Sequence, residues 1–403
     1  MKILFINRVL YPRSASETAM FCLAETLEKM GHEITFFAQD DQRNQPLPGA
    51  YVVKQPDPSS ESRLRGAMRL VYDRSVGDRL VERLRDDRPD VALVWQVNRS
   101  LTYATLEALQ LEHIPAWVML TDFTPLCPAR TMVRGGKACS LCADGSYWRC
   151  VQHLCLDGKV MRSILGAWEN RYLRLRGRYD LATGFMAPSE YHRQRFQQSG
   201  MTVKPIISAN LPLPTSAFAP VRTSRGEFFL YVGTLAQRKG LQTLLQALKQ
   251  CVNRYPLVIA GSGSYKAVME QMAAQLGVSD RVRFMGHLPP RSLRAVMCEC
   301  LCVIAPSECE EIAPWALLEA QALGKPAIVS DFGVLPERVT DGETGYVFPA
   351  GKDVSLAQCM DDMAALSPEE YAAMCAAAAE HAQACYSPAA YAQRVLDVVR
   401  GRV

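Results

Sequence analysis

Short apolar runs alternate with amphipathic stretches along the chain. Runs that are apolar throughout indicate buried strands, and stretches with helical spacing indicate helices that cover a sheet. In the N-terminal half the expected strands are 2–7, 32–38, 91–95 and 116–120, and the stretch 17–30 is an expected helix closed by Gly31. A strand–helix–strand start of this kind predicts a parallel, doubly wound α/β sheet.

The same alternation returns in the C-terminal half after a proline-rich stretch, 205–220, which we interpret as a linker. The expected strands there are 229–232, 257–261, 282–286 and 301–305, with a helix over 241–252 and a last helix that follows Tyr386-Ser387-Pro388. A chain of 403 residues is long enough for two domains that each bury a core. The pattern therefore predicts two α/β domains.

Two glutamates frame the start of one predicted helix. The run 301–305 leads into a helix expected to begin near Pro314 and to end at Gly324. Glu311 lies in the preceding loop and Glu319 lies inside the helix. Ionised carboxylates only accept hydrogen bonds, so their place at a strand end favours a hydroxyl-rich ligand such as a sugar or ribose. The alternative is a solvated acidic loop before an ordinary helix.

A longer pattern surrounds these glutamates. It comprises Ser307-Glu308-Cys309-Glu310-Glu311-Ile312-Ala313-Pro314, Glu319-Ala320, Gly324-Lys325-Pro326, Ser330-Asp331-Phe332-Gly333, Pro336-Glu337 and Asp341-Gly342-Glu343-Thr344-Gly345-Tyr346-Val347. This pattern resembles the Glu-x7-Glu signature of family-4 retaining glycosyltransferases, in a subgroup with a cysteine-rich insert in the N-terminal domain. The resemblance implies that Glu311 contacts the donor sugar and that Glu319 holds the ribose.

The resemblance also implies the GT-B fold, in which two Rossmann-like doubly wound domains face each other across a cleft and the last helix crosses back. We expect an acceptor-side domain at 1–212, joined by the helix 386–403, and a nucleotide-sugar domain at 213–385. In the donor domain, the positions that match family contacts are Gly233, Thr234, Arg238, Lys239, Gly261, His287, Ile312, Ala313 and Pro314. Thr234 stands where the family has arginine, and Arg238 beside Lys239 is its expected substitute for neutralising the diphosphate.

Two segments of the N-terminal half correspond to sites that the family directs at the substrates. The first is Arg13-Ser14-Ala15-Ser16-Glu17, where the family has a glycine-rich loop ending in glutamate. Arg13 and the hydroxyls of Ser14 and Ser16 are the groups expected to act there. The second is Thr121-Asp122-Phe123, in which Thr121 replaces a histidine that faces the donor sugar in the family.

Five cysteines between residues 127 and 155 form the second chemical feature. Cys127, Cys139, Cys142, Cys150 and Cys155 lie in a glycine-containing insert with few apolar residues. Four thiolates can hold a structural Zn²⁺, with Cys139, Cys142, Cys150 and Cys155 as the expected ligands and Cys127 or His153 as alternatives. Reduced, unligated thiols are the other interpretation.

Charge and hydropathy bear on partners and location. Residues 1–205 carry 28 Lys and Arg against 22 Asp and Glu, which suits an anionic acceptor or a membrane surface as well as an ordinary solvated face. The basic stretch 159–179 in particular suits anionic lipid headgroups, or a helix that covers the sheet. No apolar run reaches the roughly 20 residues of a membrane-spanning helix. We therefore expect a cytoplasmic protein, with the inner face of the membrane as a place of peripheral contact.

The function that these features predict is transfer of a sugar from a UDP- or GDP-linked donor, with retention, to a hydroxyl of a glycan, lipid-linked or small-molecule acceptor. Polysaccharide, lipopolysaccharide or glycoconjugate biosynthesis is the expected setting, and nucleic acid is not an expected partner. Arg238 and Lys239 supply positive charge, and there is no Asp-x-Asp pair where a catalytic metal would bind, so we expect metal-independent catalysis. The alternatives are a nucleotide-sugar epimerase of the same architecture and a family member that binds donor with weakened catalysis.

Overall fold

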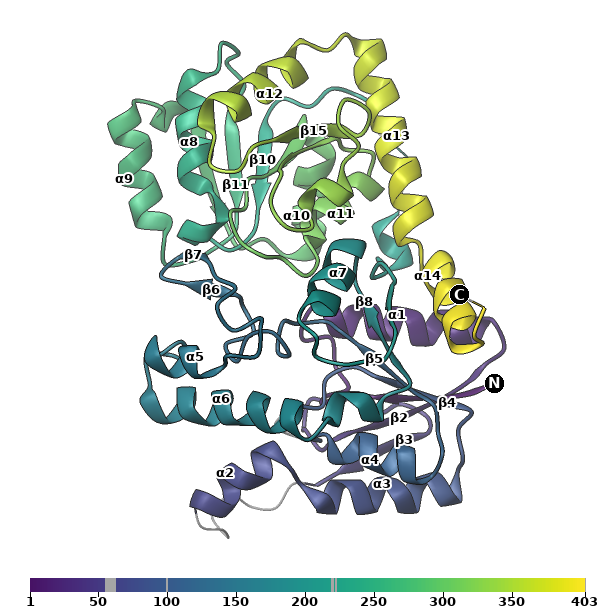
Figure 1. The fold of residues 1–403 in the computed structure, drawn as a ribbon. Coiled ribbons are helices and arrows are strands. Elements are labelled where there is room, and N and C mark those ends of the chain that lie inside the picture. Colours follow the sequence, from purple (N-terminus) through teal and green to yellow (C-terminus); the bar gives the residue numbers. More distant parts are fainter. Residues whose placement is uncertain (55–62, 99–100, 219–220, 222, 403) are drawn as a thin grey trace. The chain divides into compact units, whose positions relative to one another are not determined.

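The computed structural model describes residues 1–54, 63–98, 101–218, 221 and 223–402, and these residues form two compact units. Unit 1 comprises residues 1–132, 140–212 and 388–403, and unit 2 comprises residues 133–139 and 213–387. Each unit is an α/β layer structure built on one sheet (Figure 1).

Unit 1 contains a seven-stranded sheet in which every strand pair is parallel. Its order is β3-β2-β1-β4-β5-β8-β9, with bounds β1 Lys2–Ile6, β2 Glu33–Gln39, β3 Ala50–Val53, β4 Val91–Val94, β5 Ala116–Met119, β8 Gly184–Ala187 and β9 Ile206–Ser208. The chain proceeds outward from β1 to β3 and then returns to the other side of β1 with β4. The topological switch point of unit 1 therefore lies between β1 and β4.

The helices of unit 1 cover this sheet, and the last of them in chain order is the C-terminal helix of the protein. They are α1 Ala15–Lys29, α2 Arg63–Val71, α3 Arg74–Asp86, α4 Ala104–Leu111, α5 Trp148–Gln152, α6 Val160–Leu175, α7 Glu190–Gln198 and α14 Pro388–Val399. Helix α14 packs beside α1, although most of the sequence separates them (Figure 1). The expectation that the last helix returns to the N-terminal domain is therefore confirmed.

Unit 2 contains a six-stranded sheet that is also parallel throughout. Its order is β12-β11-β10-β13-β14-β15, with bounds β10 Phe229–Val232, β11 Leu257–Ala260, β12 Val282–Gly286, β13 Cys302–Ala305, β14 Ala327–Ser330 and β15 Gly345–Phe348. The helices are α8 Leu241–Gln250, α9 Lys266–Leu276, α10 Pro290–Glu299, α11 Trp315–Ala322, α12 Asp353–Ala365 and α13 Pro368–Tyr386. The chain switches direction between β10 and β13, so the ends of these two strands mark the ligand-binding edge expected for such a sheet.

Two segments differ from the sequence expectations. The stretch interpreted as a linker begins with strand β9, which completes the unit 1 sheet, and its last two residues, 219–220, lie outside the described residues. The cysteine-rich insert was expected to lack a hydrophobic core, but Cys142, Tyr147, Cys150 and Ala167 form a small buried cluster. The insert also contains the hairpin β6 Val133–Arg134 and β7 Lys137–Ala138, whose two glycine turn residues have positive φ, as a tight hairpin turn requires.

Candidate functional site

The loop between β13 and α11 places Glu311 at the switch point of unit 2. Glu311 Oε1 lies 2.8 Å from Lys239 Nζ, and the same carboxylate accepts a hydrogen bond from Ser307 Oγ. Both ends of the ion pair are mostly shielded from solvent, with side-chain exposures of 19% for Lys239 and 15% for Glu311. Together with Gly233 and Thr234, they line a cavity of about 280 Å³. The pair thus holds one cation and one anion at the opening where a ligand would enter.

A set of short contacts fixes this loop against the segment that carries Lys239. The Glu308 N–H donates to the Arg238 carbonyl at 2.9 Å. Gly240 has φ +68°, and a Cβ there would lie 1.8 Å from the Pro306 carbonyl oxygen, so only glycine permits this approach. From the other side, Ser330 Oγ at the end of β14 donates to the Ser307 carbonyl at 2.6 Å. The loop is therefore held by backbone contacts from two neighbouring segments.

The two glycine turns beneath the cavity also pack closely. A Cβ on Gly261 would lie 1.8 Å from the Gly233 carbonyl oxygen, and the Gly261 N–H donates to the Gly286 carbonyl at 2.7 Å. The predicted donor residue Gly261 therefore acts through the backbone, by letting the ends of β10, β11 and β12 converge. Thr234 is exposed beside them, and its carbonyl accepts a hydrogen bond from Tyr231 Oη at 3.0 Å.

A second cavity of unit 2 has a volume of about 440 Å³. Glu319 and His287 are among its lining residues, and Glu319 Oε1 accepts a hydrogen bond from Trp315 Nε1 at 3.1 Å. Burial raises the pKa of Glu319, and the Trp315 hydrogen bond and the charge of Arg294 offset part of that rise. Arg294 is itself held by the Ser216 carbonyl. Trp315 lines the smaller cavity, so its hydrogen bond to Glu319 links one residue of each lining.

Four further predicted donor residues lie in this region, and of these only Pro314 lines a cavity, the smaller one. Ile312 and Ala313 are half-buried in the loop after Glu311, and Pro314 is the buried N-cap of α11. Arg238 is half-buried beside the thiol of Cys309, whose pKa is raised by burial and partly lowered again by Lys239 and Arg238. Arg238 therefore contributes charge near the cavity, whereas Lys239 contributes it within the lining.

Sequence reasoning missed three residues of this site. Ser307 and Arg294 were given no role, although Ser307 contacts Glu311 and Arg294 lines the larger cavity. Trp315 was also given no role. Its position four residues before Glu319 on a helix was the available signal, because residues so spaced are neighbours on a helix surface.

In unit 1, the residues predicted to form a substrate loop, 13–17, form the start of helix α1. Ser14 is the N-cap of this helix, accepts a hydrogen bond from the Ser16 N–H at 3.3 Å and donates to the buried Glu17 carboxylate. Arg13 lies 3.8 Å from the same carboxylate. The Ser-x-x-Glu spacing typical of helix N-termini explains this arrangement. These side chains hold the loop in place at the carboxyl end of β1.

Thr121 and Asp122 follow β5 and are half-buried. Asp122 Oδ1 accepts a hydrogen bond from the Thr124 N–H at 2.8 Å, and Oδ2 lies 3.9 Å from Arg130 Nη1. The carboxylate therefore stabilises the turn that leaves the strand. Both residues lie at the carboxyl edge of the unit 1 sheet, where open α/β sheets bind ligands.

The predicted zinc site is not supported. All five insert cysteines are described, and among the described residues no group of three or more His, Cys, Asp or Glu side chains is placed to hold a metal ion. Cys142, Cys150 and Cys155 instead pack in the hydrophobic cluster of Tyr147, and Cys139 lies outside it. Burial raises the pKa of the Cys150 thiol to about 12, in keeping with a small apolar side chain.

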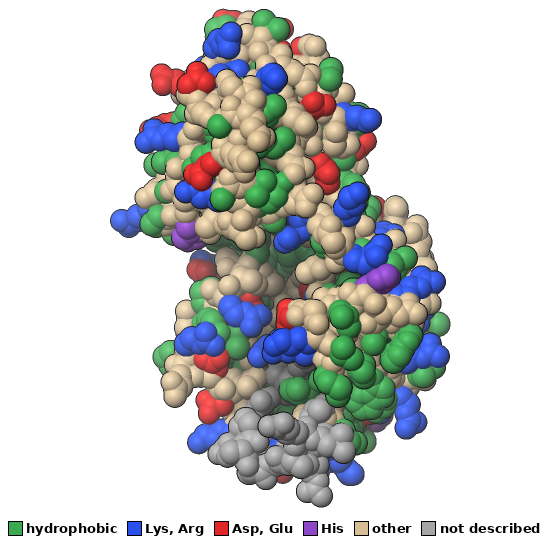
Figure 2. All heavy atoms as spheres, turned by 90° about the vertical axis from the view of Figure 1, so that its left-hand side faces the viewer, with side chains coloured by type: hydrophobic (Ala, Val, Ile, Leu, Met, Phe, Trp, Pro, Cys, Tyr) green, Lys and Arg blue, Asp and Glu red, His purple; other side chains and the backbone are tan. Residues whose placement is uncertain are grey.

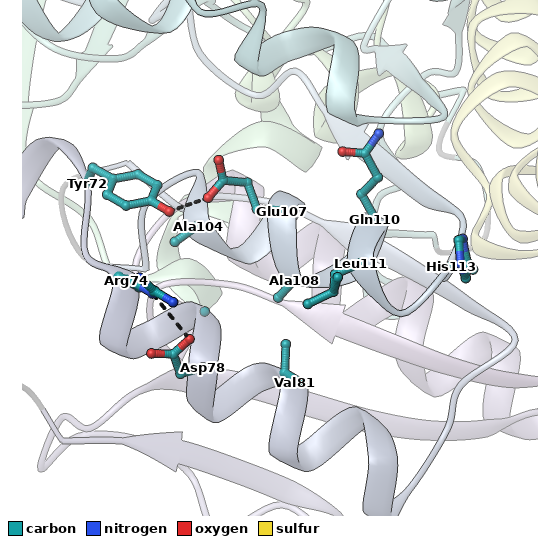
Figure 3. A pocket seen from close by; sticks show the side chains of 11 residues that line it. Tyr72, Arg74, Asp78, Val81, Ala104, Glu107, Ala108, Gln110, Leu111 and His113 are labelled. Carbon is teal, nitrogen blue, oxygen red and sulfur yellow. Dashed lines mark hydrogen bonds and ion pairs between the residues drawn. The ribbon is translucent and has the colours of Figure 1, made fainter.

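A larger cavity, of about 600 Å³, lies in unit 1 between α3 and α4 (Figure 3). Its polar groups pair with one another: Tyr72 Oη bonds to Glu107, and Arg74 Nε lies 3.8 Å from Asp78 Oδ1. Glu107 also pairs with Arg178. Because Arg74, Asp78 and Glu107 already have partners and the cavity lies between two covering helices, the smaller cavities of unit 2 are the stronger candidate site.

The fold class follows from comparison with solved structures. The chain superposes on the apo form of the lipopolysaccharide outer core galactosyltransferase WaaB with a TM-score of 0.69 and 17% identity, over 100% of both chains. It also superposes on Anabaena Alr3699/HepE in complex with UDP, with a TM-score of 0.67 and 17% identity over 100% of both chains. The chain has the GT-B fold of these glycosyltransferases.

The sequence comparison is more specific for part of the chain. Residues 215–381 match the family model of glycosyl transferases group 1. The D-inositol 3-phosphate glycosyltransferase of Corynebacterium diphtheriae is 32% identical over 42% of this chain and 41% of its own length. The D-rhamnosyltransferase WbpZ of Pseudomonas aeruginosa is 35% identical over 33% of this chain and 35% of its own length. The chain thus spans less than half the length of these curated relatives.

Proposed function

We propose that the protein is a retaining glycosyltransferase that moves a sugar from a nucleoside diphosphate sugar to an acceptor hydroxyl. The observation that carries this proposal is the Lys239–Glu311 pair at the switch point of unit 2, joined through Trp315 to the cavity of Glu319. The match of residues 215–381 to group 1 glycosyltransferases supports it, as does the UDP bound by the Anabaena neighbour.

Each side chain then has a distinct task. Glu319 accepts hydrogen bonds from the ribose, because an ionised carboxylate in a half-buried cavity is a strong acceptor. Lys239, with Arg238 behind it, offsets the negative charge that grows on the diphosphate as its bond to the sugar breaks. Glu311 stabilises the positive charge that develops at the anomeric carbon until the acceptor oxygen bonds to the same face. These cations are the proposed reason that catalysis needs no metal.

We infer that the donor is UDP- or GDP-linked and that the acceptor is a glycan, a lipid-linked sugar or a small molecule. Relatives that act on inositol 3-phosphate and in lipopolysaccharide synthesis favour polysaccharide or glycoconjugate biosynthesis as the setting. The epimerase alternative gains no support from the named relatives. We place the enzyme in the cytoplasm, with peripheral contact at the inner membrane face. Every helix in the described part of the chain is too short or too polar to cross a bilayer.

The substitution Glu311→Gln tests the proposal, because it keeps size and hydrogen bonding but removes the charge. Loss of an electrostatic contact in a shielded site should lower kcat by roughly 10²-fold or more, with a smaller change in donor KM. Glu343→Gln, an exposed carboxylate of unit 2, is the matched control and should leave both constants unchanged. A near-normal kcat for Glu311→Gln would leave Glu311 as a sugar-binding residue only.

An acceptor screen separates the remaining alternatives. Conversion of the donor to an epimer without acceptor would favour an isomerase, and donor binding without any turnover would favour the weakened family member. Activity that survives a chelator would agree with metal-independent transfer, whereas full loss with recovery on adding a divalent cation would contradict it.

A further inference from the structure

The outward face of α6 is apolar, whereas a surface helix ordinarily turns its polar residues outward. At about 100° per residue, one arc of the helix gathers the side chains that are exposed or half-buried. These are Val160, Met161, Ile164, Leu165, Trp168, Arg171, Tyr172 and Leu175. Met161 is 74% exposed and Leu175 is 68% exposed. Most of the remaining arc, which includes Ala167 and Leu173, is buried against the unit, and Arg162 and Arg174 are its less buried members.

Helix α5 extends this apolar surface. Trp148 is 61% exposed, and a cavity of about 440 Å³ lies between α5 and α6. Its lining is mostly apolar or aromatic: Gly145, Ser146, Tyr147, Trp148, Ile164, Ala167, Trp168 and Arg171. We call the exposed residues Trp148, Val160, Met161, Trp168 and Leu175 the α5–α6 face. Figure 2 shows hydrophobic side chains gathered with Lys and Arg side chains on the visible side of the molecule.

Exposed cations border the α5–α6 face, whereas the exposed carboxylates of Asp144 and Asp157 are each paired with an arginine. Lys159, Arg171 and Arg176 are exposed along α6 and at its ends. The single acidic residue of the helix, Glu169, is buried on the opposite arc. Arg162 is also exposed and is paired with Asp157 at 2.5 Å. An occupant of this face must therefore accept apolar side chains at the centre and cations around them.

We propose that the α5–α6 face docks on an anionic lipid surface. Two tryptophans beside apolar side chains, with arginine and lysine at the edge, match the layering of a bilayer interface, where headgroup charge lies next to acyl chains. A second copy of this face would instead bring like charges together. The membrane contact deepens the proposed function, because a transferase docked on a lipid surface could reach a lipid-linked acceptor there. It rests on the proposed function in this respect only.

Vesicle flotation tests the proposal with the intact chain. The protein should float with vesicles of phosphatidylglycerol and phosphatidylcholine, and less so with phosphatidylcholine alone or at high salt. The double variant Met161→Asp/Leu175→Asp and the single variant Arg171→Glu should each lower partitioning at least about tenfold. The matched controls Val252→Asp and Lys249→Glu change exposed residues of unit 2 and should float normally.

Tryptophan fluorescence reports which face makes the contact. Trp95 and Trp117 are buried, whereas Trp148 and Trp168 are exposed. Anionic vesicles should therefore shift the emission to shorter wavelength in the natural protein, and the Trp148→Phe/Trp168→Phe variant should lose this shift. A variant that retained the full shift would overturn the assignment.

Three further outcomes would also contradict the proposal: equal binding to neutral vesicles, no binding to any vesicle, or a dimer in solution that Met161→Asp dissolves. UDP binding, measured on the same samples, separates this failure from failure of the proposed function. A protein that binds UDP but no vesicle refutes only the membrane contact, and one that floats but binds neither UDP nor GDP counts against the donor site.

Discussion

The hydrogen bond from Trp315 to Glu319 allows a sharp test of the nucleotide cavity. Trp315 Nε1 donates to Glu319 Oε1 at 3.1 Å, and among the described residues the other carboxylate oxygen has no recorded partner. In the proposed function, that oxygen would accept a hydrogen bond from a ribose hydroxyl. Removing the carboxylate by Glu319→Ala deletes the acceptor, and removing the indole N–H by Trp315→Phe leaves the acceptor but no longer orients it.

The expected magnitudes differ between the two variants. A hydrogen bond to a charged group contributes about 1.5–3 kcal/mol, so Glu319→Ala should weaken UDP or GDP binding about 10- to 100-fold. Trp315→Phe keeps the carboxylate and an aromatic ring, so we expect a loss of about 1 kcal/mol, roughly fivefold in Kd. The exposed carboxylate variant Glu343→Ala is the control and should bind like the natural protein.

Calorimetry with deoxy nucleotides shows whether the lost contact is to the ribose. The 2′-deoxy and 3′-deoxy forms of UDP and GDP each lack one hydroxyl. At least one should bind the natural protein more weakly than its ribose form, and that difference should vanish in Glu319→Ala. If Glu319→Ala binds UDP and GDP as the natural protein does, or retains the full preference for ribose, the assignment of Glu319 is wrong.

The pH dependence follows from the raised pKa of Glu319. Burial disfavours the ionised form, so at neutral pH the carboxylate costs folding stability. That cost is relieved as pH falls through the raised pKa toward the ordinary value of 4.5. Glu319→Gln should therefore be more stable than the natural protein at neutral pH, with an advantage that shrinks on acidification. Nucleotide binding should weaken on the same acidification, because protonation removes the negative charge that strengthens the hydrogen bond from the ribose.

Three further variants test the surrounding structure. Lys239→Ala should lower kcat for the donor about tenfold or more, and it should lower the melting temperature relative to Lys249→Ala only by the cost of leaving the shielded Glu311 without its cation. A variant that melts early but is fully active when folded would make Lys239 structural. Gly240→Ala should lower the free energy of unfolding by at least about 2 kcal/mol in urea titrations, since its Cβ would lie 1.8 Å from the Pro306 oxygen at positive φ, and an unchanged midpoint would contradict this. Tyr147→Ala should lower unfolding stability by about 3–5 kcal/mol, because the ring is buried and its hydroxyl bonds to the Pro125 carbonyl at 2.7 Å. A chelator should leave the melting temperature of the natural protein unchanged. If Tyr147→Ala instead had no effect and the chelator lowered the melting temperature, a bound metal and not the cluster of Tyr147 would stabilise the insert.

The alternation of strands and helices could be predicted from the sequence because parallel strands are buried on both faces. Runs such as 91–94 and 302–305 are apolar without interruption, and such runs stand out against the flanking helices. Strand β9 was misread because Pro205 directly precedes it and Pro212 follows soon after. Proline at the margin of a short edge strand is compatible with pairing, so the proline signal alone could not separate strand from linker.

The cysteine-rich insert shows how cysteine density can suggest a zinc site that the structure does not support. Its cysteine density suggested a metal because the insert alone contains too few apolar residues for a core. The missing apolar surface comes from α6, which contributes Ala167 to the cluster of Cys142, Tyr147 and Cys150. A contact between segments separated in sequence cannot be read from the composition of one of them. The same limit hid Arg294 of α10, which meets the Ser216 carbonyl and the cavity of Glu319 only in the fold.

The Lys239–Glu311 pair suggests how the site holds opposite charges before a donor arrives. A lysine meant for a diphosphate and a carboxylate meant for an anomeric cation would each be costly to bury alone, whereas together they offset one another. Gly240, the Pro306 carbonyl and the Ser330–Ser307 hydrogen bond fix the backbone around the pair, so little reorganisation remains for the ligand to drive. A diphosphate that draws Lys239 away would leave Glu311 unpaired and facing the sugar. The charge that stabilises the anomeric carbon would then be uncovered by the same event that neutralises the leaving group.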